Sequence, residues 1–533
     1  MGFLLAILLW VADESQKVRP ADPPPPSLAT RIQLAAAGGD CAGAQVVVRG
    51  PVRALTATSR VPGLDVHLSR VATLWLEHPS GPEGATGDWP DPLIPVRDVL
   101  YGEPRRAFPV DVPPNRAQAI FVEACVPRGT KRGITAGSVR VTWQGGAQDV
   151  PIEVRARGFD LPATPALGTA FGFSGYSAAK GHRRGPEANQ ELTQAYDRMA
   201  LRRGITLFGG TQDPPPFQIL GDEVRIVDWK PYDDEVGPFL DGTALPSGAR
   251  WTSVELRTPV KLTRPQRKAW RRAWVEHFRA RGWLDRLFVY VQDEPEDKQL
   301  GEVERKAREV LDDAPEVRRL VTTAWTPDLP SVDFWVPLLN CLGEKTLTCR
   351  RSSPREKYPR LWWYQSCMSH GCNNDKPTTH PAFRGWPSYM IDAPATASRA
   401  MGALAFATGV TGELYFAVNF AYDLADPWRS QWAFGGNGDG TLYYPGRPDA
   451  IGGTHHVPVE SLRVVQIARS IADYGYLALC ARLGDARLAQ EEARALAPSL
   501  QGWARDPKAY AAMRERVSAR IEALLAARKA SAE

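Results

Sequence analysis

Two adjacent acids and a proline follow the apolar run LFVYVQ at residues 287–292, and their types and spacing suggest chemistry. Asp293 and Glu294 end the run, and Pro295 removes a backbone donor while restricting Glu294 to extended conformations. Neighbouring side chains on a regular strand point to opposite faces, so the two acids converge on one ligand only where the strand bends. We therefore expect the strand to leave its ladder at this point.

Pairs of carboxyl groups carry out glycoside hydrolysis in many enzymes. Direct displacement uses acids on opposite sides of the sugar, usually from different strands, and an adjacent pair fits it poorly. A substrate-assisted route fits better, in which the sugar's own 2-acetamido oxygen attacks the anomeric carbon. Glu294 would then protonate the leaving oxygen, and Asp293 would hold the acetamido N–H and stabilise the oxazolinium intermediate.

The same residues have a structural interpretation. Acids favour the first turn of a helix, and the charged segment EDKQLGEVERK at residues 296–306 predicts a helix directly after the proline. The tripeptide alone therefore leaves two roles open, a helix cap and a catalytic pair.

Aromatic residues near predicted strand ends favour the sugar site. The chain has 17 Trp, 15 Tyr and 17 Phe, more than a core of this size needs. Aromatic faces stack on sugar rings, and an amide can read a hydroxyl or acetamido group. The candidates for substrate binding are Trp325, Trp363, Tyr364, Tyr415, Asn419 and Trp428. Core packing is the alternative for each, and we expect it to hold for about half of them.

The elements that must position these residues change in kind along the chain. Short β runs separated by Gly and Pro predict a β-sandwich over residues 17–158. Strands and helices then alternate over residues 159–481, including an amphipathic helix that starts after Thr263 and stops at Gly282, which predicts a (β/α)8 TIM-like barrel. Residues 482–533, rich in Ala, Arg, Leu and Glu, predict C-terminal helices. The fold class is thus multidomain, β plus α/β.

The N-terminus and the cysteines bear on location. The apolar stretch at residues 3–12 is too short to span a bilayer and lacks a basic flank, so residues 1–16 are either a signal segment or contain a buried first strand. Three disulfides and one leftover thiol would suit a protein exported to the periplasm or the medium. The candidate pairs are Cys41 with Cys125, Cys341 with Cys349 and Cys367 with Cys372. Buried free cysteines are the alternative, and spacing does not fix connectivity.

Several function classes are disfavoured. The net charge of +5 is spread without basic blocks, which gives no footprint for nucleic acid. No cysteine pair has C-x-x-C spacing, and the histidines at 370, 380, 455 and 456 have no spacing that assembles a metal site. The NGDG sequence at residues 437–440 predicts a turn rather than a calcium loop. No further stretch predicts a transmembrane helix, and the oligomeric state stays open.

Six segments in order give the chain a resemblance to a known family. They are GAQVVV, FVYVQDEP, LWWYQSC, GELYFAVNFAYDLADPW, NGDGTLYYPG and VESLRVVQIARSIADYGYL. With them the chain resembles glycoside hydrolase family 123, whose members are retaining β-N-acetylgalactosaminidases. Phe416 stands where many relatives carry tryptophan, and the loop CMSHGC at residues 367–372 matches no family feature.

The resemblance implies a β-sandwich followed by a TIM-like barrel, Asp293 and Glu294 as the catalytic pair, and no metal or organic cofactor. It also implies that Trp363, Tyr364 and Tyr415 shape the acetamido pocket. The expected partner is a glycan with a terminal or internal 2-acetamido sugar. Two alternatives remain: a non-catalytic glycan-binding protein, and a glycosidase for another sugar in which Asp293 acts with a distant acid.

Overall fold

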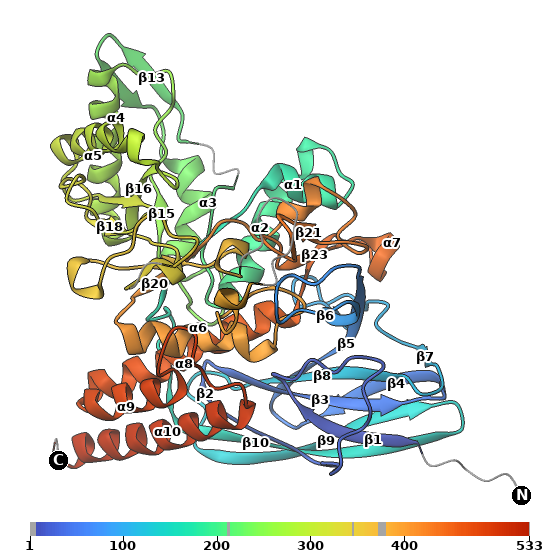
Figure 1. Ribbon diagram of the computed structural model, residues 1–533. Coiled ribbons are helices and arrows are strands. Elements are labelled where there is room, and N and C mark those ends of the chain that lie inside the picture. The colour runs from blue at the N-terminus through green and yellow to red at the C-terminus, as the bar shows by residue number, and fades with distance from the viewer. Residues whose placement is uncertain (1–6, 211–213, 344–345, 371–379, 532–533) are drawn as a thin grey trace, which may run out of the picture.

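The computed structural model describes residues 7–210, 214–343, 346–370 and 380–531. Two N-terminal β-sheets lie at one end of the molecule, a mixed α/β region lies at the other, and long C-terminal helices run beside both (Figure 1). The β-rich start, the α/β middle and the helical end agree with the order predicted from the sequence.

The two N-terminal sheets face each other as a sandwich-like pair. The first contains β1 (Leu8–Asp13), β3 (Cys41–Arg49), β8 (Ala117–Cys125), β5 (Asp65–Leu76) and β6 (Gly87–Pro95), in that spatial order. The second contains β2 (Ile32–Gly38), β10 (Gly146–Asp160), β9 (Gly133–Trp143), β4 (Val52–Arg60) and β7 (Val110–Val112). Alternate residues such as Val46, Val48, Val139 and Val141 are fully buried and share one core, as the period of a strand requires.

Residues 8–13 adopt the strand that the sequence left as one of two alternatives. Strand β1 pairs antiparallel with β3, from Leu8 opposite Arg49 to Asp13 opposite Ala44. Trp10 is 2% exposed and packs beneath the sheet. The N-terminal apolar stretch therefore includes an integral strand of the first sheet.

The α/β region is built on short parallel strands. One parallel sheet has the order β12 (Leu207–Phe208), β11 (Gly168–Gly172), β20 (Gly412–Tyr415), β19 (Trp363–Tyr364). The other has the order β15 (Val254–Glu255), β16 (Leu287–Gln292), β17 (Arg318–Val321), β18 (Phe334–Trp335). Parallel bridges from Trp335 to Leu361 and from Leu338 to Tyr364 join the second sheet to the first.

Three small antiparallel strand pairs complete the strands of the described residues. They are β13 (Phe217–Leu220) with β14 (Glu223–Ile226), β21 (Trp432–Ala433) with β22 (Gly436–Asn437), and β23 (Tyr443–Gly446) with β24 (Val457–Glu460). The NGDG segment forms the predicted turn, closed by a hydrogen bond from the Thr441 N–H to the Gly438 carbonyl.

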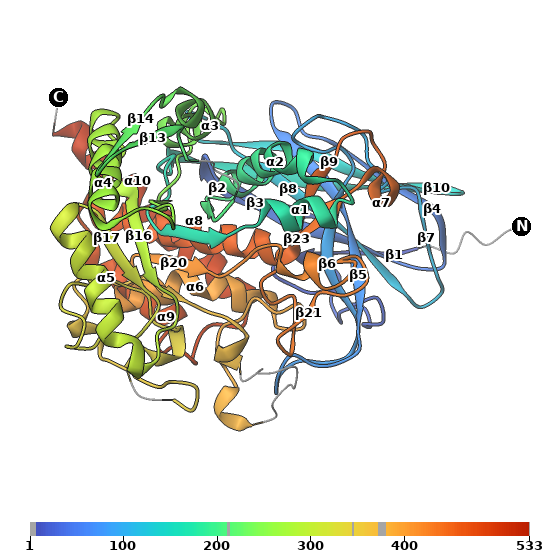
Figure 2. The same ribbon diagram turned by 90° about the horizontal axis from the view of Figure 1, so that it is seen from above.

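The helices lie around these strands and toward the C-terminus (Figure 2). They are α1 (Gly175–Gly181), α2 (Asn189–Arg202), α3 (Lys230–Asp241), α4 (Arg264–Ala280), α5 (Leu300–Asp313), α6 (Ala395–Thr408), α7 (Pro448–Ile451), α8 (Leu462–Leu483), α9 (Ala486–Leu496) and α10 (Pro507–Ala530). Among the described residues, none of these helices combines the length and apolar character needed to cross a bilayer. The domain boundary predicted at residue 481 falls inside α8.

Helix α4 shows how closely local sequence rules hold. Thr263 and Gln266 form a capping box at its start, and Trp270, Trp274 and Phe278 are buried along one face. The helix ends at Ala280, and Gly282 follows with a φ of +73°, the left-handed conformation that glycine adopts without strain. The predicted helix is confirmed.

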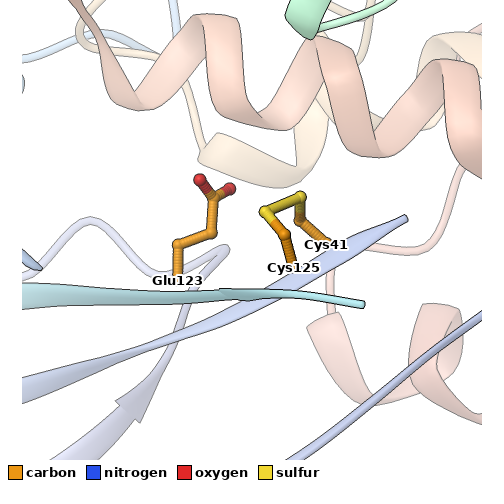
Figure 3. A group of neighbouring side chains, drawn as sticks. All are labelled: Cys41, Glu123 and Cys125. Carbon is orange, nitrogen blue, oxygen red and sulfur yellow. A yellow bond between two sulfur atoms is a disulfide. The ribbon is translucent and has the colours of Figure 1, made fainter. Parts of the chain in front are cut away.

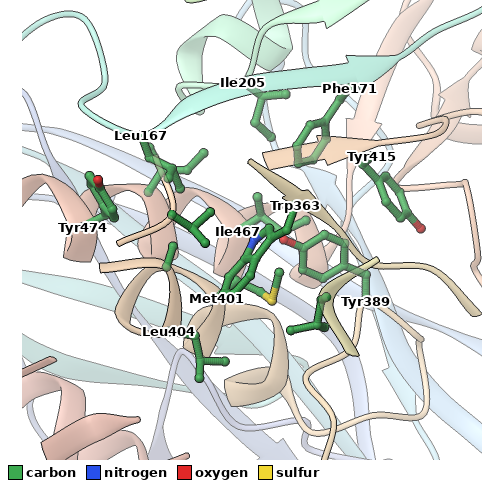
Figure 4. Packing of buried hydrophobic residues seen from close by; sticks show 14 of the residues in the cluster. Leu167, Phe171, Ile205, Trp363, Tyr389, Met401, Leu404, Tyr415, Ile467 and Tyr474 are labelled. Atoms are coloured by element: carbon green, nitrogen blue, oxygen red, sulfur yellow. The ribbon is translucent and has the colours of Figure 1, made fainter. Parts of the chain in front are cut away.

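A large core lies between the parallel strands and helices α6 and α8. Figure 4 shows Trp363, Tyr389 and Tyr415 among the aliphatic side chains of this core. Trp363 and Tyr415 are each 0% exposed. Aromatic residues at the ends of predicted strands therefore pack in the core as well as lying at the surface.

Buried ion pairs join the sandwich to the rest of the chain. Glu123 of β8 accepts hydrogen bonds at 2.7 Å from Arg203, just beyond α2, and from Arg469 of α8. Burial alone would raise the pKa of Glu123, but the two guanidinium groups outweigh it and hold the pKa below its usual range. Removing one partner of such a pair leaves an uncompensated charge, so this contact fixes the relative position of the two regions.

Two of the candidate cysteine pairs form disulfides. Cys41 is bonded to Cys125 across β3 and β8, and Cys341 is bonded to Cys349. Cys367 is also disulfide-bonded, while its predicted partner Cys372 lies outside the described residues.

Cys41, Glu123 and Cys125 form the grouping of possible metal donors found among the described residues (Figure 3). Both sulfurs are used in the disulfide and the carboxylate is held by two arginines. This cluster therefore serves as a structural cross-link.

Candidate active site

The strand that carries the two acids bends before it reaches them. Strand β16 pairs with β17 through Tyr290, and the register then shifts before Gln292. A bulge of this kind bends its strand and increases the local twist. Asp293 and Glu294 follow directly and are both exposed. The predicted departure from the ladder is confirmed.

The conformation of Glu294 differs from the prediction. Its φ is +36°, outside the extended region that the following proline was expected to enforce. A non-glycine residue at positive φ is strained and is held there by its surroundings. Here the backbone N–H of Glu294 donates to the Thr322 hydroxyl at 2.8 Å.

Another residue fills the helix-capping role. Glu296 forms a capping box with Gln299 at the 3-10 turn that leads into α5, and its N–H donates to the Gln299 side chain at 2.8 Å. Asp293 and Glu294 lie before this turn and do not cap it. The capping interpretation of the pair is therefore wrong, and both carboxyls are left for another role.

Asp293 is held by two hydroxyl groups. The Tyr290 hydroxyl donates to Asp293 Oδ1 at 2.6 Å, and the Thr322 hydroxyl donates to the same oxygen at 2.8 Å. Because Tyr290 comes from the same strand and Thr322 from the end of β17, the position of Asp293 is fixed by two neighbouring strands.

Glu294 faces a buried tyrosine. The Tyr364 hydroxyl donates to Glu294 Oε1 at 2.5 Å from the end of β19. Desolvation by the surrounding protein raises the pKa of Glu294, the Tyr364 hydrogen bond lowers it, and the neighbouring Asp293 raises it again, with a raised pKa as the net result. A carboxyl with a raised pKa can hold a proton closer to neutral pH, as a general acid must.

A cavity of about 1330 Å3, open to solvent, lies over this pair of residues. Glu294, Thr322 and Tyr364 line it together with side chains that follow strands β17 to β19. The remaining lining residues are Pro295, Thr323, Ala324, Leu338, Cys341, Leu347, Thr348, Arg350, Arg351, Met368 and Phe383. The carboxyl ends of these parallel strands therefore share one cavity, the usual location of an active site in such sheets.

Of the predicted substrate-binding residues, Tyr364 is the one at the cavity, and the others lie elsewhere. Trp325 is half-buried, with Lys357 over its ring at 5.4 Å. Trp363, next to Tyr364, points the other way into the core, as alternation along a strand dictates.

Three more predicted residues make hydrogen bonds within the protein. The Tyr415 hydroxyl accepts from the Gly440 N–H at 2.8 Å. Asn419 binds the backbone of Ser174 through both ends of its amide. Trp428 donates from Nε1 to the Pro445 carbonyl at 2.9 Å. None of the three lines the cavity at Glu294.

Sequence reasoning missed four residues near the acids. Thr322 is the first residue after β17, so the rule that drew attention to Asp293 would also have found it. Tyr290 precedes Asp293 by three positions and meets it because of the bulge. Arg350 and Arg351 lie in a loop, and their place at the cavity carries no sequence signal.

Comparison with known proteins places the site in a region that is similar to one family of enzymes. Residues 264–480 match the family described as glycoside hydrolase 123, catalytic domain. This region is similar to the catalytic domain of glycoside hydrolase family 123. The match includes Asp293, Glu294 and Tyr364 together with strands β16 to β20, and it makes the protein a glycoside hydrolase.

One solved structure supports the overall fold. A family 123 glycoside hydrolase from Clostridium perfringens, described for glycolipid glycan hydrolysis, is 13% identical and has a TM-score of 0.65. The match covers 97% of this chain and 98% of that chain. A β-glucuronidase from Parabacteroides merdae is 10% identical with a TM-score of 0.24, over 79% of this chain and 48% of that one. No curated protein matches the sequence.

Proposed function

We propose that the protein is a retaining glycosidase that releases β-linked N-acetylgalactosamine, or a related 2-acetamido sugar, from glycans by substrate-assisted catalysis. One observation carries the proposal: at the cavity, Glu294 has a raised pKa and a hydrogen bond from Tyr364, directly beside an Asp293 held by two hydroxyls. The two carboxyl groups thus lie in different environments, which suits a division of roles between a general acid and an orienting carboxylate.

In the proposed first step, the acetamido oxygen of the substrate attacks the anomeric carbon and the glycosidic C–O bond breaks. Glu294 gives its proton to the leaving oxygen. Asp293 accepts a hydrogen bond from the acetamido N–H and so stabilises the positive charge that develops on the acetamido group. Water then attacks the oxazolinium, with Glu294 taking the proton back. Two inversions at one carbon give net retention.

The parallel strands support a TIM-type barrel as the frame of this site. On one side, the two sheets are joined by the bridges from Trp335 to Leu361 and from Leu338 to Tyr364. On the other side, the Thr252 N–H donates to the Thr206 hydroxyl at 2.9 Å, between the segments that carry β15 and β12. We propose a barrel over residues 159–481, a C-terminal extension over 482–533 and a sandwich that extends the predicted range 17–158 back to β1 at Leu8. We also propose export, which the two disulfides favour.

Glycoside libraries test the reaction. Hydrolysis of nitrophenyl β-N-acetylgalactosaminide and β-N-acetylglucosaminide is measured beside the 2-hydroxy analogues, with and without a thiazoline mimic of the oxazoline. The proposal requires that only the 2-acetamido sugars react and that the thiazoline inhibits. Equal turnover of a 2-hydroxy sugar would instead favour a glycosidase with a distant second acid.

Leaving groups separate the two acids. Glu294→Gln should slow a disaccharide far more than a dinitrophenyl glycoside, because a good leaving group needs no proton. Asp293→Asn should slow both, because it acts on the forming intermediate. If Glu294→Gln binds glycans and no wild-type hydrolysis is seen on simple or extended glycans, the protein binds sugars without cleaving them.

A further inference from the structure

Two arginines line the cavity that contains Glu294. Arg350 and Arg351 contribute to its wall from the loop that follows β18. The sequence predicted no role for either residue. Glu294 is the one carboxyl among the lining residues that the structure describes. The cavity wall therefore carries two permanent positive charges and a single acid that must be protonated to act.

The loop that carries these arginines is anchored. Cys349 immediately precedes Arg350 and is bonded to Cys341, which itself lines the cavity. Asn340 also donates to the Thr348 hydroxyl at 2.7 Å. A covalent link and a hydrogen bond thus hold the start of the arginine pair beside the cavity, which lowers the entropy cost of using it for binding.

The existing partners of Arg350 and Arg351 leave some of their guanidinium N–H donors available. The Arg350 side chain is 64% exposed, and its Nη2 lies 3.8 Å from Glu296 Oε1, beyond hydrogen-bond distance. Within the described residues Arg350 makes no hydrogen bond. Arg351 is paired with Asp297, and its side chain is 19% exposed. Neither acid lines the cavity, and Glu296 is shared with Lys298 at 2.8 Å.

The position of Arg350 also affects the acid. Its positive charge favours the ionised form of Glu294 and so lowers the pKa that desolvation raises. Arg350 therefore opposes the proposed acid role of Glu294 as long as its guanidinium group has no anionic partner. An anion bound to Arg350 would cancel this influence, and Glu294 would hold its proton more firmly when substrate is present.

We propose that Arg350 and Arg351 form a subsite for an anionic group of the glycan, either a sulfate ester or a carboxylate, so that the preferred substrate is an acidic 2-acetamido glycan. Guanidinium groups bind both groups through paired, charge-assisted hydrogen bonds. The inference deepens the proposed function and rests on it for the identity of the sugar that is cleaved.

Binding to a catalytically silent protein gives the direct test. In a Glu294→Gln background, calorimetry compares a neutral disaccharide containing a 2-acetamido sugar with the same disaccharide bearing a sulfate ester and with one bearing a uronic carboxylate. We expect at least one acidic ligand to bind about tenfold tighter than the neutral one. The one that does so identifies the anion, and the preference should shrink as ionic strength rises.

Variants assign the preference to the arginines. Adding Arg350→Ala with Arg351→Ala should bring the acidic and neutral ligands to within about twofold of each other. Arg350→Gln, which keeps bulk at an exposed position, serves if the double variant is poorly folded. Arg305→Ala is the matched control, since Arg305 is an exposed arginine of α5 that does not line the cavity.

The outcomes separate the inference from the function on which it rests. Equal binding of acidic and neutral ligands, or a preference that survives in the arginine variants, overturns the subsite whether or not the wild type cleaves glycans. Arginine-dependent binding of an acidic glycan, without wild-type cleavage of any 2-acetamido glycoside, supports the subsite and overturns the proposed hydrolysis.

Discussion

Two glutamate–tyrosine pairs among the described residues differ mainly in where they lie. Glu294 accepts from Tyr364 at the cavity, and Glu413 of β20 accepts from Tyr389 in the core. Desolvation raises the pKa of both acids, that of Glu413 to about 8. Glu294 is exposed, whereas Glu413 is 2% exposed and does not line the cavity at Glu294.

The comparison teaches that a perturbed acid is not by itself an active-site acid. The core pair has the larger pKa shift but no access to a substrate, so its proton serves to avoid a buried charge. The cavity pair has the smaller perturbation and an open face. Access to the cavity, together with a neighbouring second acid held by two hydroxyl groups, distinguishes the catalytic candidate.

The largest expected difference is in activity. Glu294→Gln should lower kcat/KM on a natural disaccharide by about 100- to 10,000-fold, because it removes the proton donor. Glu413→Gln should stay within about threefold of wild type, because it replaces an already neutral group in the core. Steady-state kinetics on both variants checks this, with melting curves to show that each is folded. A large loss in Glu413→Gln alone would reverse the assignment.

The next difference is in stability. Tyr389→Phe should cost about 1–3 kcal/mol of unfolding free energy, because the buried Glu413 carboxyl loses its donor where water does not replace it. Tyr364→Phe should cost less, since the exposed Glu294 can turn to water. Urea unfolding of the two variants gives the comparison. Equal losses would mean that Tyr364 is as structural as Tyr389.

The two pairs also differ in how stability depends on pH. In the folded protein Glu413 keeps its proton up to a pKa of about 8, while in the unfolded chain it ionises near 4.5. Stability is therefore full below pH 4.5 and falls as pH rises toward 8, by up to about 1.4 kcal/mol per unit from this group. Glu413→Gln should remove this part of the slope and be the more stable protein at pH 8. Unfolding curves at pH 5 to 8 test it, and an unchanged slope would contradict it.

The smallest effect concerns the pH profile of the reaction. A general acid must be protonated, so kcat/KM should fall as pH rises through the raised pKa of Glu294. The Tyr364 hydrogen bond lowers that pKa, so Tyr364→Phe should move the alkaline limb to higher pH. Tyr389→Phe is the control and should leave the limb in place. A downward shift in Tyr364→Phe would show that the tyrosine does not stabilise the ionised acid.

Local patterns predicted much of the fold. The capping box at Thr263, the apolar face of α4 and the alternating strands of the sandwich follow from side-chain period and helix-end chemistry. The position of Asp293 and Glu294 after a bent strand also followed, because the argument needed only a strand, a proline and two acids.

What the sequence could not decide was which polar and aromatic strand-end residues face the cavity. Trp363 and Tyr364 are neighbours, and a single register choice sends one to the core and the other to Glu294. The Asn419 side chain is hydrogen-bonded to the backbone of Ser174, 245 residues away, and no local sequence pattern shows this contact. Arg350 reaches the cavity through a disulfide-anchored loop, which depends on the whole fold.

Strand β1 has a practical consequence for making the protein. Val11 and Ala12 lie opposite Val46 and Gln45 of β3, and Glu14, directly after the strand, accepts from Arg469 of α8 at 2.9 Å. A recombinant version that starts at residue 17 would expose the edge of β3 and leave Arg469 short of a partner. Expression vectors should therefore retain residue 8 onward and carry any purification tag ahead of it, with a flexible spacer that leaves the strand free to pair.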